Sequence, residues 1–188
     1  MKNKYFIILF LIISHDLVSF CTVYFTPRDD IKSKLIELIE HEKESIDCAM
    51  YMLTEKTIAQ SFLKAYLRGV KIRFILDAIS MEPRYGKGLF LKNNGMYVCV
   101  HIPSLIRGFF EPIMHHKFII FGYNNIYKKS LVWTGSYNCT HSASSLHEEN
   151  VILTDNVEVI NQYKQCFNMM LARFDRAKTY QEEQEELE

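Results

Sequence analysis

The 188-residue chain has no net charge, because 22 lysine and arginine residues are balanced by 22 aspartate and glutamate residues. A protein that holds nucleic acid over its whole surface carries an excess of basic residues. That mode of binding is not indicated, so any anion must be bound by a local cluster of side chains. The chain also has no internal repeat and no low-complexity linker. Its length predicts one domain, large enough for a real core.

The cysteines follow neither a disulfide framework nor a zinc-binding pattern. There are five, an odd number, and they lie far apart at Cys21, Cys48, Cys99, Cys139 and Cys166. We expect most of them to be small buried side chains, and one disulfide is left open as an alternative. His141 and His147, taken with Cys139, match no zinc spacing either. No metal and no cofactor is therefore predicted.

No hydrophobic run is long enough to cross a bilayer, but a short one lies near the amino end. Two lysines precede nine consecutive apolar residues at 5–13, whereas a spanning helix needs about 20 residues. A basic start with a short apolar stretch is typical of a secretory signal, and a longer span would bury the charge of Asp16. We predict that residues 1–21 are a signal peptide and that the protein is exported, to the periplasm or the exterior. An uncleaved membrane anchor or a buried element of the domain is the alternative.

The remainder of the chain alternates between expected strands and helices. Apolar residues recur at helical spacing in 31–39 and 58–66, and apolar strand candidates follow at 45–51 and 70–76. Strand, helix and strand at this spacing form a βαβ unit with parallel strands. Further strands are expected at 22–25, 97–100, 117–121, 131–134 and 151–154, and further helices at 88–93, 140–146 and 157–171. The predicted fold class is α/β, a single mixed β-sheet with helices on both faces, spanning 22–178 and followed by a solvated acidic tail at 179–188.

Five side chains in one stretch suit the handling of a phosphate, namely His115, Lys117, Ser136, Asn138 and Glu149. A neutral imidazole can attack phosphorus to give a phosphohistidine, and a protonated imidazole can donate to the leaving oxygen. Lys117, Ser136 and Asn138 supply donors for the equatorial phosphate oxygens. Glu149 is placed to orient a histidine ring through its other nitrogen. The set predicts a metal-independent phosphodiesterase.

Each of these side chains also has a plainer explanation. His115 could be a core histidine, Ser136 a turn residue after a glycine, and Asn138 the N-cap of a short helix beginning at Cys139. On a strand, Lys117 would share a face with His115, and His116 would point to the other face. Of the two neighbouring glutamates, we expect Glu149 rather than Glu148 to point inward.

The spacing of these residues resembles that of the phospholipase D superfamily around its H-x-K motif. His115-x-Lys117, Gly135-Ser136-x-Asn138 and Glu149-Asn150 carry the resemblance, and the segments 46–51 and 68–77 are similar to the first half of small single-motif members. These members include bacterial periplasmic endonucleases and mitochondrial cardiolipin hydrolases, and the similarity extends over roughly residues 23–175.

The resemblance implies a phospholipase D-like fold and hydrolysis of phosphodiesters without a metal. The favoured substrate is DNA or RNA, cleaved with little sequence preference. A phospholipase acting on cardiolipin or another phosphatidyl lipid is the first alternative, and an uncleaved amino end would favour it through membrane association. An inactive protein that binds nucleic acid or membranes is the second alternative.

Two features of the motif carry further expectations. The mechanism needs two histidines, but only the H-x-K at His115 is followed by the G-S-x-N and E-N segments, and similar small members form two-fold dimers with a shared cleft. The resemblance therefore implies a homodimer with His115 of both subunits in one site. The superfamily pattern also places an aspartate five residues after the lysine, where this chain has Gly122. That departure bears on rate and stability more than on the type of reaction.

Overall fold

The computed structural model describes residues 19–102, 105–106, 109–110 and 112–185, with side chains for 19–102 and 112–175. The predicted signal or anchor lies almost wholly outside these residues. Among the described residues, no helix combines the length and the apolar character that a membrane span requires.

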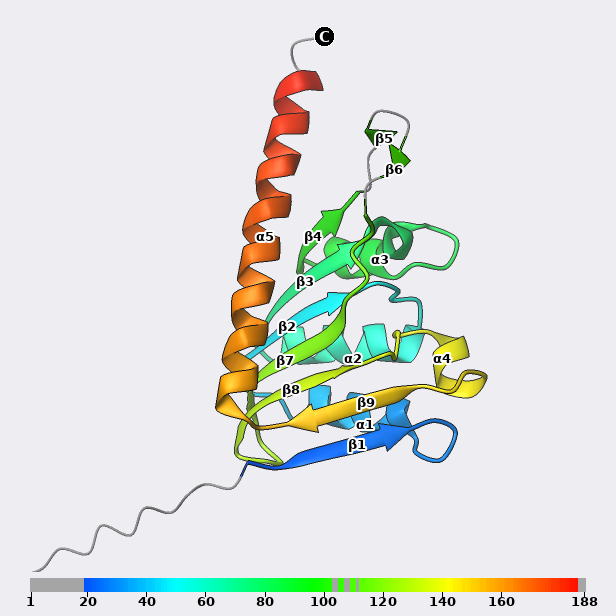
Figure 1. The fold of residues 1–188 in the computed structure, drawn as a ribbon, viewed down its shortest axis with the longest axis vertical. Coiled ribbons are helices and arrows are strands. Elements are labelled where there is room, and N and C mark those ends of the chain that lie inside the picture. Colours follow the sequence, from blue (N-terminus) through cyan, green and yellow to red (C-terminus); the bar gives the residue numbers. More distant parts are fainter. Residues whose placement is uncertain (1–18, 103–104, 107–108, 111, 186–188) are drawn as a thin grey trace, which may run out of the picture.

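A seven-stranded mixed sheet forms the centre of the molecule, in the order β1-β9-β8-β7-β2-β3-β4 (Figure 1). Its strands are β1 (Cys21–Phe25), β2 (Ser45–Met50), β3 (Lys71–Asp77), β4 (Tyr97–His101), β7 (Lys117–Asn124), β8 (Lys129–Gly135) and β9 (Asn150–Thr154). The strands β2, β3 and β4 pair in parallel, and all other neighbours pair antiparallel. The parallel pair β2 and β3 confirms the βαβ unit predicted from the hydrophobic pattern.

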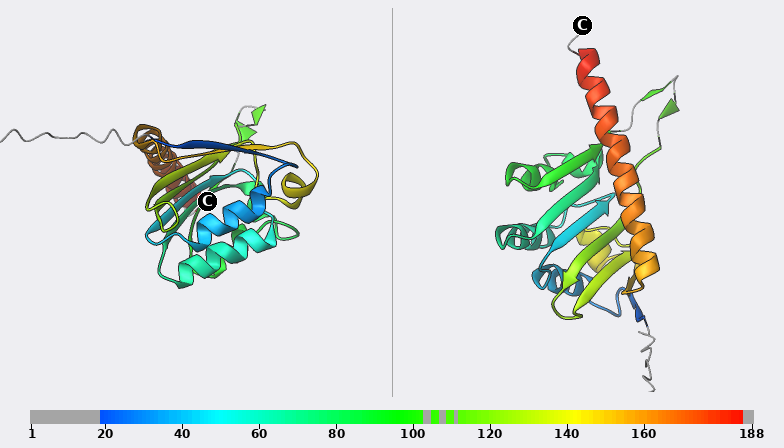
Figure 2. Two further views of the ribbon diagram at one scale, coloured as in Figure 1. Left: turned by 90° about the horizontal axis from the view of Figure 1, so that it is seen from below. Right: turned by 90° about the vertical axis from the view of Figure 1, so that its left-hand side faces the viewer.

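Helices cover both faces of this sheet. Their bounds are α1 (Ile31–Glu40), α2 (Lys56–Leu67), α3 (Gly88–Asn93), α4 (His141–Ser145) and α5 (Val157–Glu185), with a short 3-10 helix η1 (Ala78–Met81). Figure 2 shows α1, α2 and α3 on one side of the sheet and the long α5 on the other. A separate two-stranded ribbon, β5 (Leu105–Ile106) and β6 (Phe109–Phe110), follows β4. The predicted fold class is confirmed.

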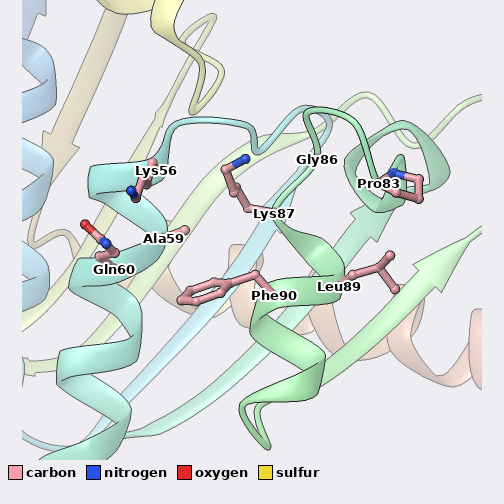
Figure 3. A pocket seen from close by; sticks show the side chains of 8 residues that line it. All are labelled: Lys56, Ala59, Gln60, Pro83, Gly86, Lys87, Leu89 and Phe90. Carbon is pink, nitrogen blue, oxygen red and sulfur yellow. The ribbon is translucent and has the colours of Figure 1, made fainter.

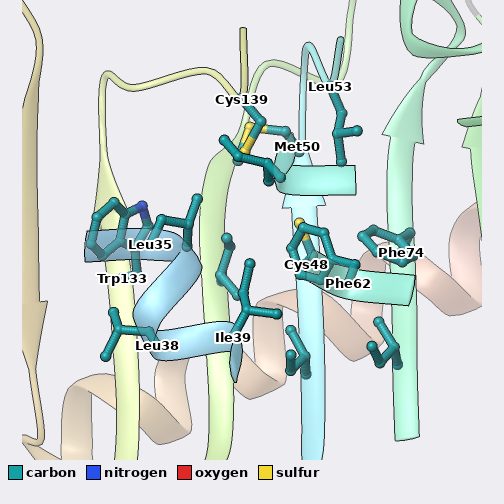
Figure 4. Packing of buried hydrophobic residues seen from close by; sticks show 14 of the residues in the cluster. Leu35, Leu38, Ile39, Cys48, Met50, Leu53, Phe62, Phe74, Trp133 and Cys139 are labelled. Atoms are coloured by element: carbon teal, nitrogen blue, oxygen red, sulfur yellow. The ribbon is translucent and has the colours of Figure 1, made fainter. Parts of the chain in front are cut away.

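The core consists of two apolar clusters, one on each face of the sheet. Successive strand residues point to opposite faces, and β7 shows this alternation directly: Ile119 and Phe121 belong to the α1–α2 cluster, and Phe118 and Ile120 to the α5 cluster. Figure 4 shows the larger cluster, in which Leu35, Leu38 and Ile39 of α1 and Phe62 of α2 pack on Cys48, Phe74 and Trp133 of the sheet. Burial on both faces explains why the central strands are continuous apolar runs.

The strand directions bring one end of many strands to the same edge of the sheet. The strands β2, β3, β4 and β8 end at this edge, and β7 and β9 begin there. In Figure 1 it is the edge beside α4. Segments near residues 51, 77, 115, 136 and 149 therefore meet, although up to about 100 residues separate them along the chain.

Three details differ from the sequence-based expectations or settle their alternatives. All five cysteines are free, and Cys48, Cys99 and Cys139 are buried, so the disulfide alternative is wrong. The segment after β3, where no helix was predicted, contains η1. The closing helix α5 runs on to Glu185, into the expected acidic tail, because the glutamine and glutamate residues there are good helix formers.

Candidate active site

His115 and Lys117 lie at the start of β7, against the aromatic ring of Tyr51. Tyr51 directly follows β2, and its backbone N–H donates to the carbonyl oxygen of His116 at 2.8 Å. The centroid of its ring lies 4.5 Å from that of the His115 ring and 5.1 Å from Lys117 Nζ. Both predicted site residues therefore contact the ring of one tyrosine. The side chain of His115 is exposed, which argues against the core-histidine explanation.

The ammonium group of Lys117 sits partly buried between its neighbours. Its Nζ donates to the backbone carbonyl of His115 at 2.8 Å. Burial lowers the pKa of Lys117, and the negative charge of Glu149 acts in the opposite direction. The adjacent His116 instead contacts the ring of Phe118, 5.5 Å between centroids, in the α5 cluster. This contact confirms that His116 points to the other face of β7.

Ser136 and Glu149 form a hydrogen-bonded pair at the ends of β8 and β9. The Ser136 hydroxyl donates to the Glu149 carboxylate and accepts from the N–H of Asn150 at 3.1 Å. The backbone N–H of Glu149 donates to Thr26 Oγ1 at 2.7 Å, which ties it to the end of β1. Glu149 is half-buried whereas Glu148 is exposed, so the expectation that Glu149 points inward is confirmed.

Asn138 is held by the turn that follows β2. Its Oδ1 accepts a hydrogen bond from the backbone N–H of Met52 at 3.2 Å. This bond uses the acceptor end of the amide, so the donor end is the one suited to a substrate oxygen. The interpretation of Asn138 as an N-cap is wrong, because α4 begins only at His141 and is capped by Thr140 Oγ1, 3.1 Å from the N–H of Ala143.

The structure thus brings the predicted residues to one edge of the sheet. Ser136 is joined to Glu149, Glu149 acts electrostatically on Lys117, and Lys117 shares Tyr51 with His115. Contact between Glu149 and a histidine ring stays a prediction, since the carboxylate of Glu149 accepts from Ser136 in the single chain. In the part of the chain with described side chains, no three potential metal-binding side chains gather in one place.

Sequence reasoning missed Asp77, whose carboxylate binds the backbone of Met114, the residue before His115. Asp77 ends β3 and is 3% exposed. Its Oδ2 accepts from the backbone N–H of Met114 at 3.1 Å and lies 3.6 Å from Nδ1 of the largely buried His101. The carboxylate therefore fixes the residue immediately before His115. An aspartate closing the apolar run 70–76 was the available signal, because a buried carboxylate needs a partner.

The surroundings of Gly122 leave no room for a side chain there, and the buried side chain of Glu42 binds the neighbouring amides. A Cβ atom at residue 122 would lie 2.5 Å from Ser45 Oγ and 3.1 Å from Ser45 N. Glu42 Oε1 already accepts from that Ser45 N–H at 3.1 Å, and also from the N–H groups of Glu44 at 2.9 Å and Tyr123 at 2.8 Å. A carboxylate thus reaches the amides beside residue 122 from the loop after α1, not from residue 122 itself.

The seven-stranded mixed sheet with helices on both faces defines the class of protein by its fold, which is α/β. A family model described as "Cardiolipin synthase, PLD-like domain" matches residues 35–171. The chain belongs to the phospholipase D superfamily, as one of its small members.

Curated relatives and solved structures agree with this placement. A phospholipase D of Rickettsia prowazekii is 31% identical, covering 81% of this chain and 67% of the relative, and the mitochondrial cardiolipin hydrolase of Xenopus tropicalis is 26% identical, covering 84% and 69%. The chain thus spans about two thirds of the length of these relatives. NucT from Helicobacter pylori superposes with a TM-score of 0.72 at 22% identity, covering 82% of this chain and 96% of NucT. Nuc from Salmonella typhimurium, a phospholipase D family member, superposes with a TM-score of 0.64 at 22% identity, covering 80% and 92%.

Proposed function

We propose that this protein is a metal-independent phosphodiesterase that works through a phosphohistidine intermediate and acts best on DNA or RNA, without sequence preference. The observation that carries the proposal is the gathering of His115, Lys117, Ser136 and Glu149 on one exposed edge of the sheet. Donors, a carboxylate and an accessible imidazole side by side are what attack on an anionic phosphodiester requires.

The proposed reaction has two steps. A neutral His115 attacks phosphorus and forms an N–P bond while the bond to the leaving oxygen breaks, and a second, protonated imidazole gives its proton to that oxygen. The same imidazole then removes a proton from water, which attacks phosphorus, breaks the N–P bond and releases a phosphomonoester. Lys117, Ser136 and the donor end of Asn138 bind the equatorial oxygens in both steps.

The second imidazole is the His115 of a partner subunit in a two-fold homodimer. At this edge of the sheet a single chain offers one H-x-K motif, whose His115 is exposed and can be approached by a symmetry-related copy. The other H-x-K tripeptide, His41-Glu42-Lys43, lies at the opposite edge, just before β2 begins. Sedimentation of the active protein should therefore give the mass of a dimer. Full activity from a species that is monomeric under assay conditions would contradict the shared site.

A phospholipase acting on cardiolipin or related lipids is the second candidate function. It is favoured by the names of the phospholipase D and cardiolipin hydrolase relatives, and both substrate classes present the same phosphodiester to the site. Export of the protein by a signal peptide at residues 1–21, which we propose, is compatible with either substrate. An uncleaved amino end would suit the lipid, because it would hold the site at a membrane.

A panel of substrates separates these functions. The purified protein is incubated with plasmid, single-stranded DNA, RNA and cardiolipin vesicles, each with and without EDTA. We expect cleavage of all three nucleic acids at rates that EDTA leaves unchanged. Hydrolysis confined to the vesicles would establish the phospholipase, loss of cleavage in EDTA would refute the metal-free mechanism, and no turnover of any substrate would leave a binding protein.

The pH dependence should report the interaction between Lys117 and Glu149. Activity needs the charged ammonium, so it should fall with rising pH as Lys117 loses its proton, below the pH of an ordinary lysine because burial lowers its pKa. Glu149→Gln keeps an acceptor for Ser136 but removes the charge that raises the pKa of Lys117. The alkaline limb of the residual activity should therefore move to lower pH. Glu148→Gln, at the exposed neighbour, is the matched control, and an unmoved limb in Glu149→Gln would contradict the assignment.

A further inference from the structure

A pocket lies beside the proposed active site, between the start of α2 and the loop that leads into α3 (Figure 3). Its volume is about 370 Å³ and it is open to solvent on one side. The side chains that line it come from both elements: Lys56, Ala59 and Gln60 from α2, and Pro83, Gly86, Lys87, Leu89 and Phe90 from the facing segment. Its size lies at the lower end of the range for small-molecule sites.

The lining combines a basic rim with an apolar wall. Lys56 and Lys87 are the charged residues among those that line it, and no acidic residue accompanies them. Figure 3 shows the two lysine side chains on facing elements, with the Phe90 ring below them and projecting toward α2. Lys56 is also the first residue of α2, where the helix dipole adds to the positive potential. The charged residues that line the pocket are therefore both basic, and the carboxylate of Glu55, which caps α2, lies next to Lys56 in the chain.

Backbone hydrogen bonds connect this pocket to the catalytic edge. The backbone N–H of Lys87 donates to the carbonyl oxygen of Leu53 at 2.9 Å. Leu53 directly follows Met52, whose N–H donates to Asn138. Ser80 Oγ reinforces the same turn, because it accepts from the N–H of Leu53 at 3.0 Å and donates to the carbonyl oxygen of Tyr51 at 2.9 Å. The turn at residues 51–53 therefore contacts both the candidate site, through Asn138, and the pocket, through Lys87.

We propose that this pocket binds a nucleotide of the substrate strand that flanks the scissile phosphodiester. The two ammonium groups would pair with the backbone phosphate, and the base would lie against Phe90, since an aromatic ring accepts any base by stacking. Phosphate contact and stacking give affinity without reading the sequence. The proposal rests on the proposed nuclease function and deepens it by naming a binding subsite outside the catalytic cluster.

A nucleic acid fits this pocket better than a phospholipid does. A lipid headgroup would satisfy the lysines, but the acyl chains of the lipid need a long apolar channel. The apolar residues that line this pocket are few, namely Ala59, Pro83, Leu89 and Phe90. A strand, in contrast, offers a phosphate and a planar ring at every nucleotide. The pocket is open to solvent, and the Lys87–Leu53 hydrogen bond joins its wall to the turn that follows Tyr51.

The double variant Lys56→Gln with Lys87→Gln tests the subsite, because it removes both charges and keeps most of each side-chain stem. For a single-stranded oligodeoxynucleotide we expect KM to rise about tenfold while kcat stays within about twofold, as for lost uniform binding. The slope of log KM against log salt should fall by about 0.7, the value for the one neutralised phosphate on a single strand that the two ammonium groups share. Hydrolysis of bis(p-nitrophenyl) phosphate, which has no flanking nucleotide, should not change.

The matched control is Lys64→Gln with Lys92→Gln, which removes the same charge from exposed positions of α2 and α3 outside the pocket. Equal effects of the two double variants on the oligonucleotide, or no effect of either, would overturn the subsite. A defect confined to cardiolipin vesicles would also overturn it. If the wild-type protein cleaves no nucleic acid, the proposed function fails, and anisotropy of a labelled oligonucleotide still decides the subsite: binding that is weakened by the Lys56 and Lys87 changes alone supports it, and any other result refutes it.

Discussion

Replacing His115 by alanine is expected to lower kcat for nucleic acid by about 10³-fold or more, because both the nucleophile and the proton donor of the shared site are lost. The ring is exposed and contacts Tyr51, so its removal leaves no buried cavity. The thermal midpoint of unfolding should therefore stay close to that of the wild type. Initial rates on single-stranded DNA and on bis(p-nitrophenyl) phosphate measure the effect.

His116 provides the matched control for this experiment. It is adjacent in sequence, carries the same side chain and contacts Phe118 on the other face of β7. Burial lowers the pKa of His116. We expect His116→Ala to retain activity within about tenfold of the wild type, since it makes no proposed contact with the phosphate. A larger loss in His116→Ala than in His115→Ala would reject the assignment of the nucleophile.

The largest loss of stability is expected from Glu42→Ala. Glu42 is fully buried and its Oε1 accepts from three backbone N–H groups that join the loop after α1 to β2 and β7. Removing it leaves three donors without their acceptor, at about 1 kcal/mol or more each. The free energy of unfolding should fall by about 3 kcal/mol, a large fraction of the total for a domain of this size. Urea unfolding followed by circular dichroism measures it.

Two further variants make this result specific. Glu42→Gln keeps one acceptor oxygen and should cost clearly less than the alanine variant. Glu40→Ala, at an exposed position of α1, should change the free energy of unfolding by no more than about 0.5 kcal/mol. If Glu42→Ala were as mild as Glu40→Ala, Glu42 would not be what secures β7 beside Gly122.

The hydrophobic pattern predicted the fold class because each face of the sheet carries its own apolar cluster. The runs 45–51 and 70–76 are apolar on successive residues, as strands covered by helices on both faces must be. The helices α1 and α2 each show one apolar stripe toward the sheet, and this stripe is what periodicity detects. The end of α5 was predicted less well, since its last turns carry only the weak signal of helix propensity.

The candidate site was predictable only where its residues cluster in sequence. His115, Lys117, Ser136, Asn138 and Glu149 lie within 35 residues and match a known spacing. The same part of the sheet is also contacted by residues that lie far away in the sequence, namely Tyr51, Asp77 and Glu42. Nothing local marks a tyrosine at the end of β2 as the support of a histidine 64 positions later. Their roles follow from strand order and register, which a single sequence does not contain.

The most direct test of the phosphohistidine mechanism is to trap the intermediate. A single-stranded oligonucleotide with radiolabelled phosphate is mixed with excess wild-type protein, quenched in alkaline denaturant within a turnover, digested and mapped. The mechanism predicts an acid-labile label on the peptide that contains His115, and no label in His115→Ala. A label on another residue, or cleavage that proceeds at full rate in His115→Ala, would contradict it.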